Sequence, residues 1–226
     1  RIDEPSHSTS IDTMNRYTRP QLQQSALITI DTQNDFVLDN APARIEGTLD
    51  IIPNMVRLLE AYRSASRPIV HIVRLYQADG SNVDSCRRQQ IEDGLQMVIP
   101  NTPGAELVDA LKPDPALQLD AQRLLSGTMQ QAGDNEYILY KPRWGMFYQT
   151  RLDAFLRQQH INTLVFCGCN FPNCPRASMY QASERDYRII LVSDAMSQLY
   201  ERGEQEMHNI DVQLTSTRTL IAALTT

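Results

Sequence analysis

A cysteine-rich loop carries the residues whose types and spacing most suggest chemistry. The run from Cys167 to Arg176 reads CGCNFPNCPR, so Cys174 is followed directly by Pro175. Proline is favoured at the first position of a helix, where its missing N–H costs no hydrogen bond. Cys174 is therefore expected beside a helix N-terminus, where the dipole and free backbone N–H groups favour a thiolate. The pattern predicts an activated nucleophile, with a half-buried structural cysteine as the alternative.

Short apolar runs alternate with helical segments and predict the elements that must position this cysteine. The predicted strands are 26–30, 69–73, 137–140, 163–167 and 188–193, and the predicted helices are 49–66, 150–160, 176–186 and 201–214. Strands that alternate with helices imply right-handed crossovers and a parallel sheet covered on both faces. We therefore predict a three-layer α/β sandwich with a mainly parallel, Rossmann-like sheet of five to six strands.

The chain of 226 residues is long enough for one such domain. Residues 1–24 are polar and without periodicity, which predicts an N-terminal arm before a single domain at 25–226. A long polar stretch at 76–104 is predicted to be mainly loop, with a short helix around 87–93. Loops of this length inside compact domains are usually functional or disordered. After this loop, the pattern indicates a helical turn at 105–111 and an extended segment at 117–125.

Composition excludes several classes of partner. A net charge of −6 argues against nucleic acid or an anionic membrane as the main partner. No stretch approaches the roughly 18 apolar residues that span a bilayer, and the N-terminus lacks the apolar core of a signal peptide. Four cysteines, three of them between 167 and 174, do not resemble a secreted disulfide framework. These observations predict a protein of the reducing cytoplasm.

Polar residues follow several of the predicted strands, at the edge of the sheet where these strands end. In parallel sheets, ligands bind outside the carboxyl ends of the strands. Asp35 lies just past the first predicted strand, Lys141 directly follows the third, and Cys174 follows the fourth. Arg74 ends the second strand at the same edge and could bind a substrate carboxylate, with a surface ion pair as the alternative. We expect these side chains to meet at one edge of the sheet.

Three segments resemble the motifs of one known family. Asp31–Phe36 reads DTQNDF and resembles the D-x-Q-x-D-F opening of the isochorismatase-like cysteine hydrolases. Lys141–Leu152 is similar to the lysine segment of that family, and Gly168–Cys174, followed by Asp194-Ala195, resembles its nucleophile loop and the next strand. The resemblance covers roughly residues 25–200, and the motifs occur in the family's order.

The resemblance implies a catalytic triad of Asp35, Lys141 and Cys174. Asp35 is then the proton acceptor for the thiol, and Lys141 is the cation that supports both partners. By the same resemblance, the backbone N–H groups of Asn170 and Cys174 form the oxyanion hole. A cis peptide bond is implied between Cys169 and Asn170.

The implied function is cofactor-independent hydrolysis of a C–N bond in a small amide, ureido or carbamoyl compound through a Cys174 thioester. Members of the family tend to form homo-oligomers in which a neighbour closes the pocket. The metal-dependent nicotinamidases of the superfamily add histidine ligands between the first two triad members. Residues 76–104 contain no histidine, and His71 lies on a predicted strand, so no metal site is predicted.

Two other functions stay open at this point. One is an isochorismatase-type vinyl-ether hydrolase that uses Asp35 and Lys141 without covalent catalysis. The other is a thiol-redox or metal-binding protein built on Cys167, Cys169 and Cys174, although a structural zinc site needs a fourth ligand.

The family resemblance does not name the substrate, since the chain departs from the family pattern next to the nucleophile. Phe171 stands where threonine is common, and Pro175 stands where valine or isoleucine is common. Trp144 lies three residues after Lys141 and could stack on a flat substrate. The other candidates for substrate contact are Phe36, Arg74, Tyr148 and Phe171, for which packing is the alternative to recognition.

Overall fold

The computed structural model describes residues 15–225 and has one seven-stranded sheet. The strand order is β3-β4-β2-β1-β5-β6-β7. Only the β3–β4 pair is antiparallel among the described strands. The strands are β1 (Ser25–Ile30), β2 (Ile69–Val73), β3 (Gln130–Gly133), β4 (Glu136–Tyr140), β5 (Thr163–Gly168), β6 (Arg188–Met196) and β7 (Gln213–Thr215). The mainly parallel α/β fold is thus confirmed, with seven strands in place of the predicted five to six.

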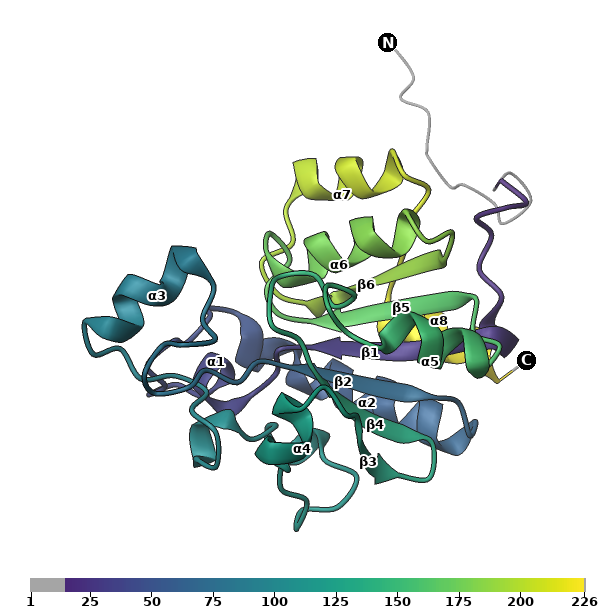
Figure 1. Cartoon of the computed structure of the whole chain (residues 1–226). Helices are drawn as coiled ribbons and strands as arrows, with labels where there is room; N and C mark the ends of the chain where they lie inside the picture. The colour runs from purple at the N-terminus through teal and green to yellow at the C-terminus, as the bar shows by residue number, and fades with distance from the viewer. Residues whose placement is uncertain (1–14, 226) are drawn as a thin grey trace.

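Helices cover both faces of this sheet (Figure 1). They are α1 (Asn34–Val37), α2 (Thr48–Ser64), α3 (Ser85–Glu92), α4 (Ala121–Leu125), α5 (Leu152–Gln158), α6 (Cys174–Ser183), α7 (Glu201–His208) and α8 (Thr217–Leu224). Side chains alternate between the two faces of a strand. Ile28 of β1 accordingly packs with α5, α6 and α7, whereas its neighbour Leu27 packs with α2 and α8. A strand with two buried faces appears in sequence as a continuous apolar run.

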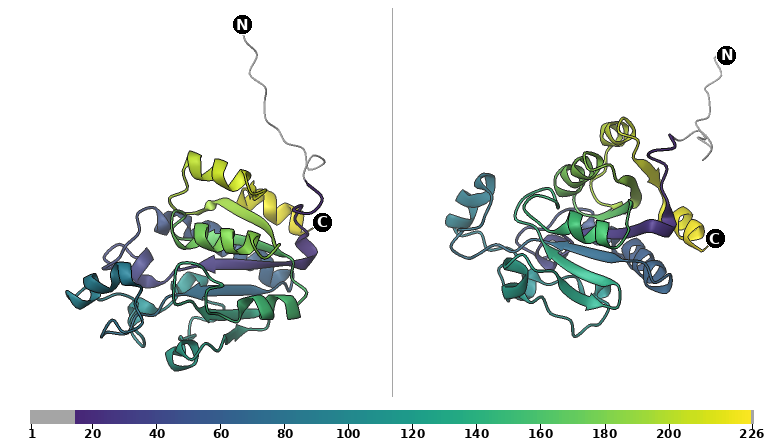
Figure 2. Two further views of the ribbon diagram at one scale, coloured as in Figure 1. Left: turned by 45° about the horizontal axis from the view of Figure 1, so that its top comes forward. Right: turned by 45° about the vertical axis from the view of Figure 1, so that its right-hand side comes forward.

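A third apolar cluster lies beyond the carboxyl ends of the strands. It contains Phe36 of α1, Val73 of β2, Ile91 of α3 and Leu124 of α4, together with Leu107 from the segment before α4. Figures 1 and 2 show α3 standing away from the sheet at this end of the molecule. The long segment between β2 and β4 therefore builds the wall of the edge at which ligands bind in such sheets.

Three predicted segments differ from the structure. The segment 117–125 was expected to be extended, but Asp120 accepts a hydrogen bond from the Arg123 N–H and starts the short helix α4. The predicted helix 201–214 ends at His208, and the chain then forms β7 and α8. The short strand β3 carries no apolar run, and hydrophobic periodicity does not detect it.

The predicted arm is only partly described, since residues 1–14 lie outside the described part. Residues 15–24 lie against the domain. The Gln21 N–H donates to Thr163 Oγ1 at 2.9 Å, and Arg188 Nη1 donates to the carbonyls of Arg16 and Arg19 at 3.1 and 2.8 Å. No helix within residues 15–225 is long and apolar enough to cross a membrane.

Candidate active site

Asp31 is the residue that β1 delivers to the carboxyl edge of the sheet. It directly follows Ile30, the last residue of the strand, and its N–H donates to the Ile72 carbonyl at 2.9 Å. Its φ of +55° lies in the left-handed region, which aspartate tolerates better than most residues. Backbone strain of this kind concentrates at functional sites. The side chain is buried against Lys141.

Lys141 occupies the equivalent position two strands away. It directly follows Tyr140, the last residue of β4, and its N–H donates to the Val73 carbonyl at 3.0 Å. Its ammonium group is fully buried and lies 3.0 Å from Asp31 Oδ2, 3.1 Å from Cys174 Sγ and 3.3 Å from the Arg143 carbonyl. A buried ammonium requires such partners, because desolvation of an unpaired charge is costly. One cation thus joins a carboxylate and a thiol.

Cys174 is the first residue of α6, as the sequence predicted. The loop that delivers it leaves β5 at Gly168, where φ is +118°. A Cβ atom at Gly168 would lie 2.4 Å from the Ile30 carbonyl oxygen and 2.6 Å from the Ile30 nitrogen. Only glycine fits there without moving β1. The approach of the two backbones brings the Cys174 loop to the end of the strand that carries Asp31.

The predicted pairing of Asp35 with this lysine is wrong. Asp35 lies inside the short helix α1, one turn farther along the chain, and its Oδ2 accepts the Val98 N–H at 2.7 Å. It also packs against Gly104, where an added Cβ atom would lie 2.2 Å from the same oxygen. The carboxylate of Asp35 therefore fastens the long loop to α1. Asp31, the first aspartate of the same motif, takes the place beside Lys141.

The pKa of the Cys174 thiol is raised, contrary to the thiolate expected from its place on the helix. Burial is the largest cause, the charge of Asp31 adds to it, and Lys141 and Arg74 oppose both. The helix N-terminus is thus outweighed by desolvation and by the neighbouring carboxylate. The free site holds a thiol beside a carboxylate that can accept its proton.

Two backbone donors of the loop that carries Cys174 are unpaired within the described residues. Neither the N–H of Asn170 nor that of Cys174 has a hydrogen-bond acceptor in the described part of the chain. The predicted cis peptide between Cys169 and Asn170 is absent, since all peptide bonds within residues 15–225 are trans. The Cys169 N–H instead donates to the Ile30 carbonyl at 2.9 Å, and the Phe171 N–H donates to the Ser197 carbonyl at 2.9 Å. These two bonds hold the loop with trans geometry.

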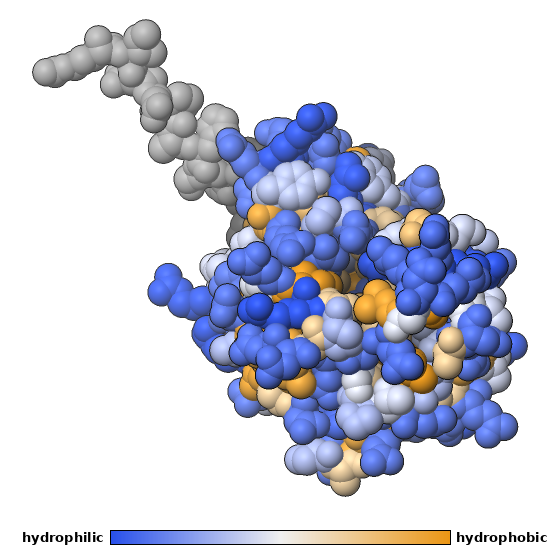
Figure 3. Space-filling view, turned by 90° about the vertical axis from the view of Figure 1, so that its left-hand side faces the viewer, coloured by the Kyte–Doolittle hydropathy of each residue, from blue (hydrophilic) through white to orange (hydrophobic). Residues whose placement is uncertain are grey.

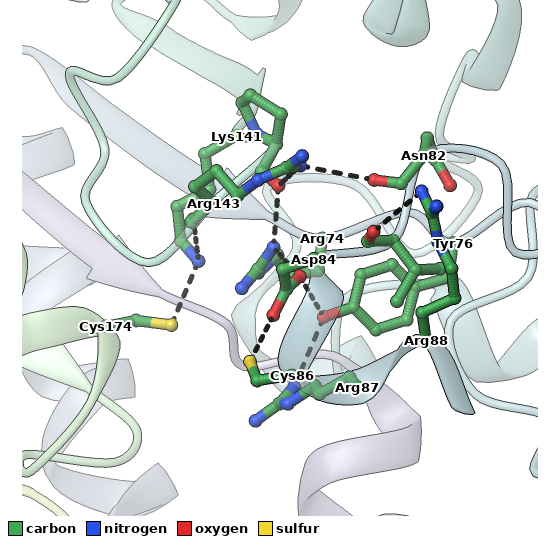
Figure 4. Close-up of polar contacts among 12 residues, drawn as sticks. Arg74, Tyr76, Asn82, Asp84, Cys86, Arg87, Arg88, Lys141, Arg143 and Cys174 are labelled. Atoms are coloured by element: carbon green, nitrogen blue, oxygen red, sulfur yellow. Dashed lines mark hydrogen bonds and ion pairs between the residues drawn. The ribbon is translucent and has the colours of Figure 1, made fainter. Parts of the chain in front are cut away.

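Arg74 directly follows β2 and lies at the same edge, as predicted. It is buried, with 1% of its surface exposed, and its Nη1 donates to Asp84 Oδ1 at 3.0 Å and to the Pro142 carbonyl at 3.1 Å. A surface ion pair, the alternative considered from the sequence, does not describe this environment. Figure 4 shows the guanidinium between the Lys141–Cys174 pair and Asp84.

The aromatic candidates lie in different environments. Trp144 is partly buried, with the guanidinium carbons of Arg74 and Arg87 5.4 and 4.7 Å from its ring centre, so it belongs to the wall of the site. Tyr148 is 44% exposed. Phe36 is buried in the cluster beyond the strand ends.

Phe171 packs in the core beside α7. Its ring is fully buried, makes an edge contact with Tyr200, and would lie 2.3 Å from a Cβ atom at Gly203. The geometry assigns Phe171 to the core between the nucleophile loop and α7.

The three cysteines between 167 and 174 pack in different apolar clusters. Cys167 packs with α2, Cys169 packs beyond the strand ends and donates to the Asp31 carbonyl at 3.2 Å, and Cys174 begins α6 and packs between this helix and the sheet. Their side chains therefore enter three separate apolar clusters. Within residues 15–225, no group of three or more histidine, cysteine, aspartate or glutamate residues is placed to hold a metal ion.

Two residues that support the site were missed from the sequence. Gln33 accepts the Arg74 N–H at 2.8 Å and donates to the Arg74 carbonyl at 2.7 Å. Asp84 holds Arg74 and also accepts a hydrogen bond from the Tyr76 hydroxyl at 2.9 Å. Gln33 lies inside the D-x-Q-x-D-F motif, which is the signal that could have found it. Asp84 lies in the polar loop, where nothing in the sequence distinguishes it.

The surface over the carboxyl edge is hollowed. Figure 3 views the molecule from this side and shows a recess with apolar residues inside it and hydrophilic residues around it. Apolar recesses with a few convergent polar groups are the usual form of small-molecule sites.

Fold and site together define an α/β protein with a buried cysteine, lysine and aspartate at the carboxyl ends of parallel strands. The isochorismatase domain model matches residues 25–123 and 120–219, and the chain belongs to this family. The "isochorismatase family protein" of Desulfovibrio vulgaris has a similar structure, with a TM-score of 0.76 and 30% identity, covering 90% of this chain and 99% of that one.

Two curated relatives carry hydrolase names. The "probable inactive nicotinamidase At3g16190" of Arabidopsis thaliana is 28% identical over 197 residues, which cover 84% of this chain and 91% of the relative. The ureidoacrylate amidohydrolase RutB of Methylobacterium radiotolerans is 27% identical over 200 residues, which cover 80% of this chain and 69% of the relative.

Proposed function

We propose that this protein is a cysteine-dependent amidohydrolase. It hydrolyses a C–N bond in a small amide, ureido or carbamoyl compound through a thioester on Cys174. The observation that carries the proposal is the buried contact of Lys141 Nζ with both Asp31 Oδ2, at 3.0 Å, and Cys174 Sγ, at 3.1 Å. A nucleophile, a proton acceptor and a cation in mutual contact are the parts that covalent hydrolysis requires.

The first half of the reaction follows from these positions. Asp31 accepts the thiol proton as the sulfur attacks the carbonyl carbon, and Lys141 stabilises the negative charge on both groups. The carbonyl oxygen becomes an oxyanion that the N–H groups of Asn170 and Cys174 can bind. When the tetrahedral intermediate collapses, the C–N bond breaks and Asp31 returns its proton to the departing nitrogen.

The second half returns the enzyme to its starting state. Asp31, again unprotonated, accepts a proton from a water molecule, which attacks the thioester carbon. The C–S bond breaks, the acid product leaves, and the proton passes to the Cys174 sulfur. The raised pKa of Cys174 suits this cycle, because a thiolate with a high pKa is a stronger nucleophile once formed.

Similarity to named relatives supports the same bond type. An ureidoacrylate amidohydrolase acts on a C–N bond, and several bacterial relatives with this name are 24–29% identical to this chain. The Arabidopsis relative is named as inactive. Activity in this chain is proposed on its own buried triad and not on that relative.

The experiment measures amine and ammonia release from a panel of small amides, ureides and carbamoyl compounds. We expect wild type to release product from at least one member and Cys174→Ala to release none. Cys167→Ala is the matched control, because its thiol packs on the opposite face of the sheet with α2. Turnover that is unchanged in Cys174→Ser would reject the thioester and favour non-covalent hydrolysis of the vinyl-ether type.

We also propose a reducing compartment, such as the cytoplasm, as the location of the enzyme. All four cysteines are free thiols, and disulfides are rare where glutathione keeps thiols reduced.

A further inference from the structure

Arg74 has two buried donors that no residue accepts. Its Nη1 donates to Asp84 and to the Pro142 carbonyl, but its Nε and Nη2 have no acceptor in the described part of the chain. Nearly all buried polar groups in proteins are hydrogen-bonded, and an unmatched one costs about 1–3 kcal/mol. These donors therefore call for an acceptor that comes from outside the chain.

The two free donors lie on one edge of the guanidinium group. The Nε–H and one N–H of Nη2 point in the same direction, and this edge can bind both oxygens of a carboxylate side by side. A neutral carbonyl offers a single oxygen, which cannot lie in line with both N–H bonds at once and carries no full negative charge. The unmatched pair thus favours a carboxylate over an amide group as the ligand.

Arg74 is held in place and cannot turn to another partner. The rings of Tyr76 and Trp144 each have their centre 5.4 Å from the guanidinium carbon. Gln33 binds both the N–H and the carbonyl of the Arg74 backbone. The free edge is therefore preorganised, which lowers the entropic cost of binding a ligand there.

The free edge belongs to the site of the nucleophile. Burial acts to lower the pKa of Arg74, but Tyr76, Cys174, Asp31 and Asp84 together outweigh it and raise the pKa. Cys174 and Asp31 thus lie close enough for their charges to act on the guanidinium.

The surrounding charge also favours an anion. Two further arginines lie beside Arg74: Arg143 donates to the same Pro142 carbonyl, and Arg87 lies over Trp144. Lys141 is a fourth cation near Arg74, and in the described part of the chain the carboxylates paired with Lys141 and Arg74 are those of Asp31 and Asp84. The whole chain has a net charge of −6, so this positive site is a local feature.

We propose that Arg74 binds a carboxylate of the substrate through Nε and Nη2, so that the substrate is a carbamoyl or ureido acid and not a neutral amide. This inference rests on the proposed hydrolase function. The carboxylate anchors one end of a short substrate on Arg74, and the carbamoyl carbon at the other end lies over Cys174.

The experiment compares N-carbamoylglycine and N-carbamoyl-β-alanine with their neutral primary amides as substrates. We expect wild type to prefer the acids in kcat/KM by about 10- to 100-fold, the range of a charge-assisted pair. Arg74→Met removes the preference mainly through a higher KM, and Arg74→Lys keeps part of it. Arg88→Met is the matched control, because that arginine is exposed and donates only to the carbonyls of Ser81 and Val83.

Binding to Cys174→Ala, measured by calorimetry, separates this inference from the proposed function. If no compound is turned over but Cys174→Ala binds the acids and not their amides, and Arg74→Met abolishes this, the carboxylate site stands and the hydrolase function fails. If wild type hydrolyses acids and amides equally well in a Cys174-dependent way, the function stands and the inference is overturned. Circular dichroism of Arg74→Lys and Arg74→Met shows whether either variant has lost its fold.

Discussion

Two aspartates of one motif have different roles in this structure, and the difference lies in their distance from the strand. Asp31 is the first residue after β1 and reaches Lys141, whereas Asp35 lies in α1 and binds the Val98 N–H. We expect Asp31→Asn to lower turnover at least 100-fold, the usual contribution of a general acid–base group. Asp35→Asn should retain turnover within a few-fold, because its amide oxygen can still accept the Val98 N–H. Steady-state kinetics of the two variants on one substrate decides between them.

The same pair of variants gives a second readout on the Cys174 thiol. The rate of alkylation by iodoacetamide reports the thiolate fraction, which rises with pH, so a raised pKa moves the midpoint above the ~8.5 of an ordinary cysteine. The charge of Asp31 contributes to the raised pKa, so Asp31→Asn should move the midpoint to lower pH while Asp35→Asn leaves it in place. All measurements use a Cys86→Ala background, since Cys86 is exposed. If Asp35→Asn lowered the midpoint of the alkylation profile and Asp31→Asn did not, Asp35 and not Asp31 would be the proton acceptor.

The sequence could show that an aspartate lies at this edge of the sheet but not which one contacts Lys141. Both aspartates belong to the same six residues, and both lie near the end of an apolar run. The choice depends on where β1 ends and α1 begins, and element boundaries are the least certain part of a sequence-based prediction. The positions of Lys141 and Cys174 were easier to predict from the sequence. Lys141 directly follows its strand, and Pro175 marks the helix start beside Cys174.

At the scale of elements, Glu136 connects one helix with two strands. These contacts lie away from the candidate site. Glu136 is the first residue of β4, and its carboxylate accepts hydrogen bonds from Arg63 of α2 and from His71 of β2. Burial acts to raise its pKa, but these two partners outweigh burial and lower the pKa to about 2. Because the folded-state pKa is depressed, the stabilisation is present above about pH 4.5 and is lost as pH falls toward 2.

This linkage predicts the effect of Glu136→Gln on stability. The shift corresponds to a contribution on the order of 3 kcal/mol at neutral pH, so Glu136→Gln should lower the free energy of unfolding by about that amount at pH 7. The difference from wild type should shrink steadily below pH 4. Urea unfolding at several pH values measures both, with Glu60→Gln on the exposed face of α2 as the control. An equal loss at pH 7 and pH 3 would contradict the role given to the carboxylate.

The elements that the sequence revealed are those whose burial is continuous. Strands β1, β2 and β5 are buried along their whole length, so each appears as an apolar run that needs no knowledge of its neighbours. Strand β3 reads QQAG and β7 reads QLT, and neither has a fully buried position. They lie at the two edges of the sheet, where pairing with a neighbour decides the strand. Helix α4 depends in the same way on a single capping bond at Asp120.

At the scale of the whole molecule, we propose that the protein forms a homo-oligomer that covers the carboxyl edge of the sheet. Segments at this edge expose large apolar side chains: Leu38, which directly follows α1, is 42% exposed, and Leu49, in the first turn of α2, is 38% exposed. Helix α3, the outer wall of the site, buries only Ile91. A neighbouring chain packed on these segments would bury apolar surface and exclude water from the nucleophile.

Light scattering during a dilution series tests this arrangement. We expect a mass that is a multiple of 25.7 kDa and a specific turnover that falls with the same midpoint as the mass, because the neighbour completes the site. Leu38→Ser should move both midpoints to higher protein concentration. Tyr17→Ser should leave them unchanged, since this side chain, 69% exposed, belongs to the segment before β1, which the oligomer is not proposed to cover. A monomer with full turnover at every concentration would instead show that one chain holds the complete site.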